Sequence, residues 1–250
     1  MKLFAAKKKQ QEIGQSFTAQ RRYILNKNSN FFVQEAYKTL RTNVRFFLSS
    51  EGCRKFCVTS SDAGEGKSIT ILNLAISFAQ TGQKVLLIDG DLRRPTLARL
   101  MVENATPGLS NVLAGLCAEK DAIRSGIYPN LDIIFSGEIP PNPSELLGSE
   151  RMQKMIKQLE EVYDYILIDT PPVGIVADTC IVGNVVDGVL FVVRQNQAEK
   201  EPVARSVRQL EMSGAKLMGF VLNGTKEEVG KKNKYKYRYK YSYESKPRRQ

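Results

Sequence analysis

The sequence predicts a doubly wound α/β protein built on a mostly parallel sheet. Six short apolar runs recur along the 250 residues, and stretches with helical periodicity lie between most of them. Several of these runs are continuous rather than alternating, which is typical of parallel strands that helices cover on both faces. With 42% apolar and 25% charged residues, the chain has the composition of a globular domain with a real core.

The expected elements follow one another in a regular order. The first is an amphipathic helix over residues 31–49, FFVQEAYKTLRTNVRFFLS. Strands are expected at 55–60, 84–89, 131–135, 164–169, 188–193 and 216–222. Helices are expected at about 68–81, 109–115, 149–161 and 199–213. No apolar run reaches about 18 residues, so no membrane span is evident.

The net charge of +11 is concentrated at the two ends of the chain. Residues 226–250 hold ten Lys/Arg and three Glu, and residues 1–22 hold six Lys/Arg and one Glu, so residues 23–225 sum to −1. Basic arms on a neutral core indicate contact with something anionic, although two merely solvated, disordered ends would look the same. We therefore expect a basic N-terminal arm at 1–30, one domain at 31–225 and a flexible basic tail at 226–250.

The first strand runs directly into a glycine-rich loop, SSDAGEGKSITILNLA, residues 60–75. Its pattern fits a phosphate-binding loop in which Ser61 replaces the usual first Gly. Gly64 and Gly66 let backbone N–H groups converge on a phosphate, and Lys67 would reach the β and γ phosphates. Ser68 would offer its hydroxyl to Mg²⁺ at the N-terminus of the next helix. The alternative is a glycine-rich turn that binds nothing. The candidate nucleotide-binding residues are Ser61, Asp62, Ala63, Gly64, Glu65, Gly66, Lys67, Ser68 and Ile69.

Carboxylates stand at the ends of two other predicted strands. LLIDGDLRRP (86–95) contains Asp89 and Asp91, and YILIDTPP (165–172) contains Asp169. In open α/β sheets ligands bind at the carboxyl ends of the strands, where Mg²⁺ and a general base belong. The alternative is a solvated acidic turn. We expect an ATP–Mg²⁺ site with Lys67, Asp89, Asp91 and Asp169 as catalytic residues and Ser68, Asp89, Asp91 and Asp169 as metal-site residues.

The C-terminal stretch YKYRYKYSYE, residues 235–244, alternates tyrosines with mostly basic residues. As a strand it would place every tyrosine on one face. As a nucleic-acid arm its bases would contact phosphates while its rings stack. As a substrate it would offer five phenol hydroxyls. The tail alone does not decide among the three.

Taken together, these motifs carry a family resemblance. The GEGKS loop, IDGDLRRP, IDTPP and the tyrosine cluster resemble the bacterial tyrosine kinases that control capsular and extracellular polysaccharide export, and PPNPSELL (140–147) is also similar. The resemblance implies a phosphate-loop NTPase of the partitioning-ATPase-like type. It implies an ATP-dependent tyrosine autokinase that modifies a neighbouring subunit's tail in trans and regulates polysaccharide synthesis. The tail residues implied as phosphorylation sites are Tyr235, Tyr237, Tyr239, Tyr241 and Tyr243.

The resemblance also implies roles for residues outside the loop. Because the chain has no His, Asp89 or Asp91 must accept the tyrosine's proton, and we favour Asp89. Asn223 would contact the adenine. The segment EAYKTLRTN (35–43) resembles the family's oligomerisation motif, whose pattern is matched by Glu35 and Arg41. Lys38 replaces an Arg of that motif and cannot make Arg's bidentate contact to a carboxylate.

The implied partners follow from the same family. They are further copies of the chain in a homo-oligomeric ring, for which an octamer is one expectation, a transmembrane adaptor that activates the kinase, and a cognate tyrosine phosphatase. The chain resembles the form of the family that is separate from its adaptor. The expected location is the cytoplasm, at the inner face of the membrane, without a specific nucleic-acid partner.

Two other interpretations of the sequence compete with the kinase. Partitioning and division-site ATPases switch dimerisation with ATP, but their loop usually carries a Lys at the position of Asp62 and they lack a tyrosine cluster. The other alternative is a nucleic-acid-binding module that uses the tail. The neutral core and the strictly spaced tyrosines weaken this interpretation.

Overall fold

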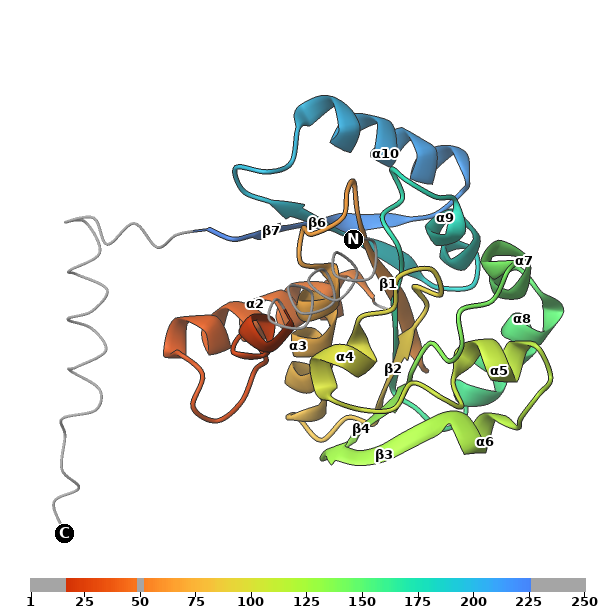
Figure 1. Cartoon of the computed structure of the whole chain (residues 1–250). Coiled ribbons are helices and arrows are strands. Elements are labelled where there is room, and N and C mark those ends of the chain that lie inside the picture. The colour runs from red at the N-terminus through yellow and green to blue at the C-terminus, as the bar shows by residue number, and fades with distance from the viewer. Residues whose placement is uncertain (1–16, 49–51, 226–250) are drawn as a thin grey trace, which may run out of the picture.

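A seven-stranded sheet forms the centre of the computed structural model, which describes residues 17–48 and 52–225 (Figure 1). The strand order is β3-β4-β2-β5-β1-β6-β7, and every neighbouring pair is parallel except β3 and β4. The strands are β1 (Arg54–Ser60), β2 (Val85–Asp89), β3 (Ile123–Tyr128), β4 (Leu131–Ile134), β5 (Tyr165–Asp169), β6 (Gly188–Arg194) and β7 (Leu217–Asn223). The mostly parallel α/β sheet expected from the sequence is therefore confirmed.

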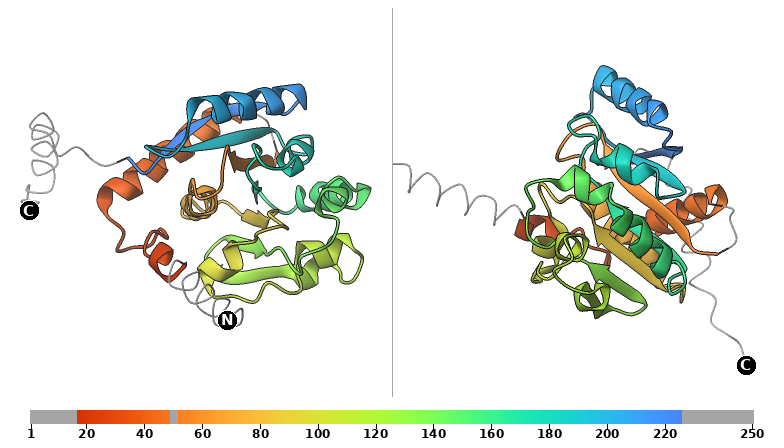
Figure 2. Two further views of the ribbon diagram at one scale, coloured as in Figure 1. Left: turned by 45° about the horizontal axis from the view of Figure 1, so that its top comes forward. Right: turned by 90° about the vertical axis from the view of Figure 1, so that its right-hand side faces the viewer.

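Helices cover both faces of this sheet (Figure 2). One face is covered by α2 (Phe31–Phe47), α3 (Lys67–Ala79) and α4 (Leu97–Met101). The other is covered by α5 (Leu109–Leu113), α6 (Glu119–Ala122), α7 (Pro143–Leu147), α8 (Glu150–Leu159), α9 (Asp178–Gly183) and α10 (Lys200–Met212). In the part of the chain that the structure describes, no helix is long and apolar enough to cross a membrane.

The continuous apolar runs fold as strands because both of their faces are buried. In β1, Phe56 and Val58 belong to the core under α2 and α3, while Cys57 between them belongs to the core on the opposite face. All three side chains are fully buried. Burial of apolar surface at roughly 25 cal/mol per Å² makes this two-sided core the main source of stability.

The six expected strands and the longer helices are present, with ends that differ by a few residues. The structure adds β3 at one edge, and it adds the short helices α4, α6, α7 and α9, which span four to six residues. Elements this short contain barely more than one helical turn, so they show no hydrophobic periodicity in the sequence.

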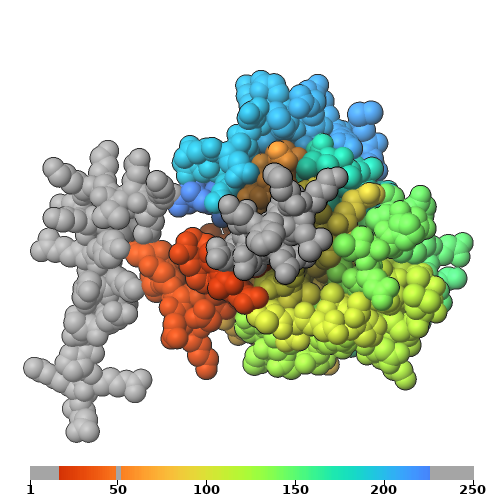
Figure 3. Space-filling model, viewed as in Figure 1, coloured from red at the N-terminus to blue at the C-terminus, as the bar shows by residue number. Residues whose placement is uncertain are grey.

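The segment before α2 packs on the domain from residue 17 onward. Residues 17–21 are helical, and Leu25 is 3% exposed. The backbone N–H of Leu25 donates to Asn73 Oδ1 on α3 at 2.7 Å, and Arg21 Nε donates to the carbonyl of Leu100 at 3.1 Å. Part of the segment assigned to the basic arm therefore belongs to the folded body, where it lies on one side of the molecule together with α2, in red and orange (Figure 3).

Candidate active site

The phosphate loop, residues 61–69, joins the carboxyl end of β1 to α3. Gly64 and Gly66 have φ angles of 82° and 92°, in the left-handed region that favours glycine. No side chain caps the N-terminus of α3, so its first N–H groups are available to an anion. Lys67, the first residue of α3, is only 8% exposed. The loop therefore has the backbone geometry and the cation that a phosphate group requires.

A buried carboxylate braces the loop from within. Ser61 Oγ donates to Glu65 Oε1 at 2.9 Å, and the Glu65 side chain is fully buried. Glu65 Oε2 has no hydrogen-bond partner, and burial raises the pKa of this carboxyl. Ser61, which stands where a glycine is usual, holds Glu65 through its hydroxyl and so ties the first residue of the loop to the fifth.

Asp89 and Asp169 stand side by side where β2 and β5 end. They are register partners on the two parallel strands, and both are fully buried. Asp89 Oδ2 accepts the backbone N–H of Leu97 at 3.2 Å, but Asp89 Oδ1 and both oxygens of Asp169 have no partner. Burial raises the pKa of Asp89, and the neighbouring Asp169 and Asp91 raise it further. Burial also raises the pKa of Asp169, against the lowering effect of Lys67.

Unpartnered buried carboxylates are costly, so this arrangement suits a cation. Ser68, beside Lys67, accepts a 2.7 Å hydrogen bond from Thr96 Oγ1. Asp91 is 7% exposed and accepts the backbone N–H of Arg94 at 2.9 Å. No group of three His, Cys, Asp or Glu among the described residues forms a ready-made metal cage. Mg²⁺ seldom uses such a cage, because it keeps waters and binds substrate phosphates, so the residues fit a nucleotide-bound Mg²⁺.

Comparisons with known proteins agree with this geometry. The family model described as "AAA domain" matches residues 53–211. The tyrosine-protein kinase YwqD of Bacillus subtilis is 42% identical over 192 residues, which cover 77% of this chain and 81% of YwqD. The chain belongs to the bacterial tyrosine kinase family.

Solved structures place the fold in the same group. The kinase domain of the Escherichia coli tyrosine kinase ETK matches with a TM-score of 0.76 and 34% identity, covering 79% of this chain and 78% of that one. The septum site-determining protein MinD of Pyrococcus horikoshii, solved with Mg-ADP, matches with a TM-score of 0.58 and 26% identity, covering 70% and 72%. The expected phosphate-loop kinase fold and its resemblance to division-site ATPases are confirmed.

The kinase holds its loop through three side chains that the sequence did not single out as a group. Asn223 Nδ2 donates to the carbonyl of Glu65 at 2.9 Å, Arg194 Nη1 to that of Gly64 at 3.0 Å and Gln197 Nε2 to that of Ala63 at 3.2 Å. The expected adenine contact of Asn223 stays a prediction, and in this structure its amide lies on the loop. Arg194 ends a strand parallel to β1, and that position is the sequence signal for its place at the site.

The first arginine of DGDLRRP is also positioned by other side chains. Arg93 Nε lies 2.7 Å from Asp178 Oδ2, and Arg93 Nη2 donates to Ser144 Oγ at 2.8 Å. Asp178 is fully buried at the start of α9, and Ser144 lies in α7 within PPNPSELL. These bonds tie the loop after β2 to both helices and thereby fix the backbone that carries Asp91.

The three candidate oligomerisation residues do not act alike in this structure. Lys38 Nζ and Glu35 Oε1 form an exposed ion pair of 2.7 Å along α2. Arg41 Nη1 instead donates to the carbonyl and hydroxyl of Ser77 on α3. Positions three residues apart advance about 300° around a helix, so each of the three side chains points about 60° away from the previous one.

The five candidate phosphorylation sites lie outside the described residues.

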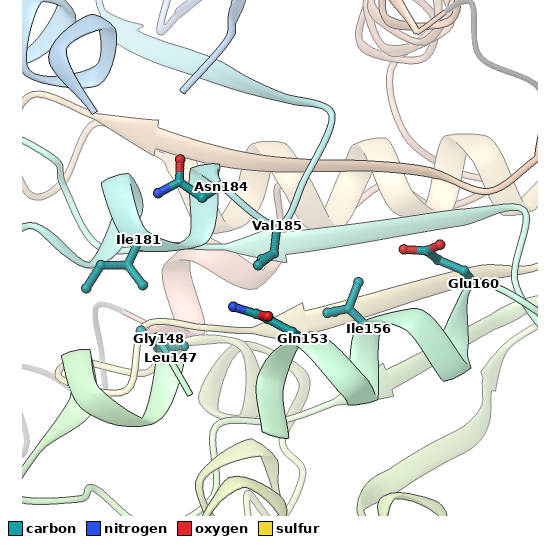
Figure 4. Close-up of a pocket in the computed structure, with 8 residues that line it drawn as sticks. All are labelled: Leu147, Gly148, Gln153, Ile156, Glu160, Ile181, Asn184 and Val185. Atoms are coloured by element: carbon teal, nitrogen blue, oxygen red, sulfur yellow. The ribbon is translucent and has the colours of Figure 1, made fainter. Parts of the chain in front are cut away.

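A separate cavity of about 410 Å³ lies between α7, α8 and α9 (Figure 4). Its lining includes Ile156, Ile181 and Gln153, and none of its lining residues comes from the phosphate loop. Glu160 at one end is held by an ion pair of 2.6 Å with Lys55. The cavity is therefore distinct from the phosphate-loop site.

Proposed function

We propose that this kinase transfers the γ-phosphoryl group of ATP to tyrosines of the tail of a neighbouring subunit. The observation that carries the proposal is the meeting, at one edge of the sheet, of an uncapped helix N-terminus, Lys67 and the buried carboxylates Asp89 and Asp169. Tyrosines Tyr235, Tyr237, Tyr239, Tyr241 and Tyr243 are the proposed acceptors.

Each residue has a role that follows from its position. The N–H groups at the start of α3 and the Lys67 ammonium would hold the β and γ phosphates. Ser68 and Asp169 would hold Mg²⁺ directly or through water, with Asp89 and Asp91 next to them. When bound, Mg²⁺ supplies neutralisation of the charge on the transferring group. Asn223 is the proposed neighbour of the adenine.

The transfer step balances without a further reactant. The tyrosine oxygen forms a bond to the γ phosphorus while the bond from that phosphorus to the β–γ bridging oxygen breaks, which leaves ADP. The phenol proton passes to the carboxylate of Asp89, whose burial raises its pKa and so makes it a better proton acceptor. Most of the rate should come from positioning and charge neutralisation.

The biological setting is proposed from the family resemblance. The kinase would regulate capsular or extracellular polysaccharide synthesis and export, on the cytoplasmic side of the membrane. It would work as a homo-oligomeric ring, of eight subunits in one arrangement, activated by a transmembrane adaptor and reversed by a tyrosine phosphatase. Lys38 and Glu35, which are exposed on α2, are the proposed contact residues between subunits.

Intact mass after incubation with ATP and Mg²⁺, followed by peptide mapping, tests the proposal. The wild type, with and without an adaptor fragment, should gain several phosphates on residues 235–243. Lys67→Met should gain none. A mixture of a Lys67→Met full-length chain with an active chain lacking the tail should modify the Lys67→Met chain, which shows transfer in trans.

The second candidate is a switch ATPase, because the fold also resembles MinD. An unmodified tail together with rapid ATP hydrolysis would favour this candidate. An unmodified tail without hydrolysis, even with adaptor, would contradict both candidates.

A further inference from the structure

Three consecutive carbonyl groups of the phosphate loop accept hydrogen bonds from one side. The acceptors are the carbonyls of Ala63, Gly64 and Glu65, and the donors are the side chains of Gln197, Arg194 and Asn223, at 3.2, 3.0 and 2.9 Å. We call these three donors the clamp residues. All of them lie at or just after the carboxyl ends of β6 and β7.

The clamp fixes the direction of the backbone N–H groups on the other side of the loop. In a planar trans peptide the N–H points opposite to the carbonyl. The N–H groups of Gly64, Glu65 and Gly66 therefore point away from the clamp, and none of them donates to another group within residues 17–48 and 52–225. Successive free N–H groups of this kind form an anion-binding nest.

The clamp is itself held in place by the sheet. Arg194 and Asn223 are register partners on the parallel strands β6 and β7, and the N–H of Gln195 donates to the carbonyl of Asn223 at 2.9 Å. The N–H of Gly224 donates to Asn223 Oδ1 at 2.8 Å, which orients its amide so that Nδ2 faces the loop. The amide also fills the space beside Gly66, where a Cβ would lie 2.1 Å from Asn223 Nδ2.

We propose that Arg194, Gln197 and Asn223 are positioning residues that hold the phosphate loop in its nucleotide-binding conformation before the nucleotide arrives. Without them the peptides of Ala63, Gly64 and Glu65 can rotate, and only a fraction of molecules presents the complete nest. The apparent dissociation constant then rises by the inverse of that fraction. The inference rests on the proposed nucleotide site but not on which group receives the phosphate.

The proposal differs in its consequences from a direct contact between Arg194 and the γ phosphate. A change in loop conformation weakens the binding of ATP and of ADP by the same factor, because both nucleotides use the nest. A lost contact to the γ phosphate weakens the binding of ATP alone. If these residues had a general structural role, replacing them would lower thermal stability. Because Arg194 and Gln197 are exposed, we expect their replacement hardly to change the unfolding temperature.

The test uses the full-length chain and matched variants. Gln197→Glu keeps the shape of the side chain but removes the donor, and Gln195→Glu makes the same charge change two residues away. Arg194→Gln is matched by Arg208→Gln, because the Arg208 side chain donates to the carbonyl of Ala204 in its own helix, away from the loop. Binding of fluorescent ADP and ATP analogues with Mg²⁺, thermal unfolding and NMR relaxation dispersion of the amides of residues 61–69 are measured for each.

We expect Gln197→Glu and Arg194→Gln to weaken both nucleotides equally, by about threefold to tenfold each, and more when combined. Relaxation dispersion of the Gly64–Gly66 amides should appear in the nucleotide-free variants, because their peptides then rotate between conformations, while both controls and the unfolding temperatures stay at wild-type values. Unchanged binding and relaxation in the combined variant would overturn the clamp, as would a loss confined to ATP. A wild type that binds no nucleotide would instead contradict the proposed function, while the relaxation measurement would still decide the clamp.

Discussion

At the scale of single residues, this phosphate loop departs from the usual pattern at its first position. Ser61 stands where a glycine is common, and its hydroxyl donates a hydrogen bond to the buried Glu65 carboxylate. A buried carboxylate that loses its donor keeps its full desolvation cost. The serine at this position therefore offsets part of the cost of burying Glu65 in the same loop.

We predict that Ser61→Ala lowers the free energy of unfolding by about 1–3 kcal/mol. The cause is that Glu65 Oε1 then loses its hydroxyl donor, while Oε2 has no partner to begin with. Urea denaturation measures the change, and Ser61→Thr, which keeps the hydroxyl, is the control. Equal unfolding midpoints for the alanine variant and the wild type would show that Glu65 does not need this bond.

The Asp89 carboxylate, in contrast to the hydrogen bond from Ser61 to Glu65, should lower the stability of the nucleotide-free protein. Its pKa is raised above the unfolded value, so the folded protein keeps this proton to a higher pH than the unfolded chain does. The free energy of unfolding therefore falls as pH rises between the two pKa values, and it stays reduced above the folded one. We expect Asp89→Asn to raise the unfolding temperature of the nucleotide-free protein at pH 8 while reducing tyrosine phosphorylation by at least about 100-fold.

Thermal unfolding in EDTA at pH 5 and pH 8 checks the stability half of this prediction. The gain from Asp89→Asn should be larger at pH 8, and Glu161→Gln, at an exposed carboxylate, should show no such trend. A variant that is less stable than the wild type at pH 8 would mean that Asp89 is satisfied within the apo protein.

At the scale of elements, the sequence located the parallel strands well because each is apolar on both faces. It missed β3, IRSGIY, whose side chains are half-buried or exposed on an antiparallel edge strand. It placed the loop after β1 and Asp89 and Asp169 at the ends of β2 and β5, because a motif and a strand end can be read locally, while their roles stay predictions. It did not identify the roles of Arg194 and Gln197, which lie about 130 residues from the carbonyls they hold. Such contacts depend on the strand order, which the local pattern does not specify.

The connection between β5 and α9 braces the phosphate loop from another side. The N–H of Val173 donates to the carbonyl of Ser60 at 3.0 Å, and a Cβ at Gly174 would lie 2.3 Å from the carbonyl oxygen of Ser61. We predict that Gly174→Ala displaces the loop, which lowers the free energy of unfolding by about 1–3 kcal/mol and weakens ADP binding. Denaturation and nucleotide titration measure the two effects. Ile175→Ala, on the same connection but 58% exposed, is the control and should match the wild type.

Variants in helix α2 should distinguish residues that stabilise the subunit from residues that hold subunits together. Arg41 is bonded to Ser77 on α3, so we expect Arg41→Ala to lower the free energy of unfolding by about 1–2 kcal/mol. The exposed pair of Glu35 and Lys38 contributes at most about 1 kcal/mol. Glu35→Ala should therefore leave monomer stability nearly unchanged but reduce oligomer mass in sedimentation. An unchanged oligomer would remove Glu35 from the proposed subunit contact.

At the scale of the whole molecule, the sheet gathers one site from five strands that are scattered along the sequence. The carboxyl ends of β1, β2 and β5 carry the loop and the aspartates, while β6 and β7 carry the clamp. Since β7 ends at Asn223, the clamp also lies at the point from which the chain continues toward the basic tail. The active site and the root of its proposed substrate segment therefore share one edge of the sheet.

The uneven charge leads to a last prediction about the whole chain. Residues 226–250 hold ten Lys/Arg and three Glu, while residues 23–225 sum to −1. Each phosphate adds about −1.5 to −2 charges, so five phosphates would cancel or invert the positive charge of the tail. We expect the unphosphorylated chain to co-sediment with vesicles containing phosphatidylserine at low salt, and the phosphorylated chain to stay in solution.

A chain that ends at residue 225 separates the tail from the remaining basic residues at the N-terminus. It should lose most of the vesicle binding, and a full-length Lys67→Met chain incubated with ATP should keep it, because its tail stays unmodified. Binding that persists after complete phosphorylation would assign the membrane affinity to residues 1–22. Binding that is insensitive to salt would show that the attraction is not electrostatic. In either case the tail's charge could not act as a switch that releases the kinase from an anionic surface.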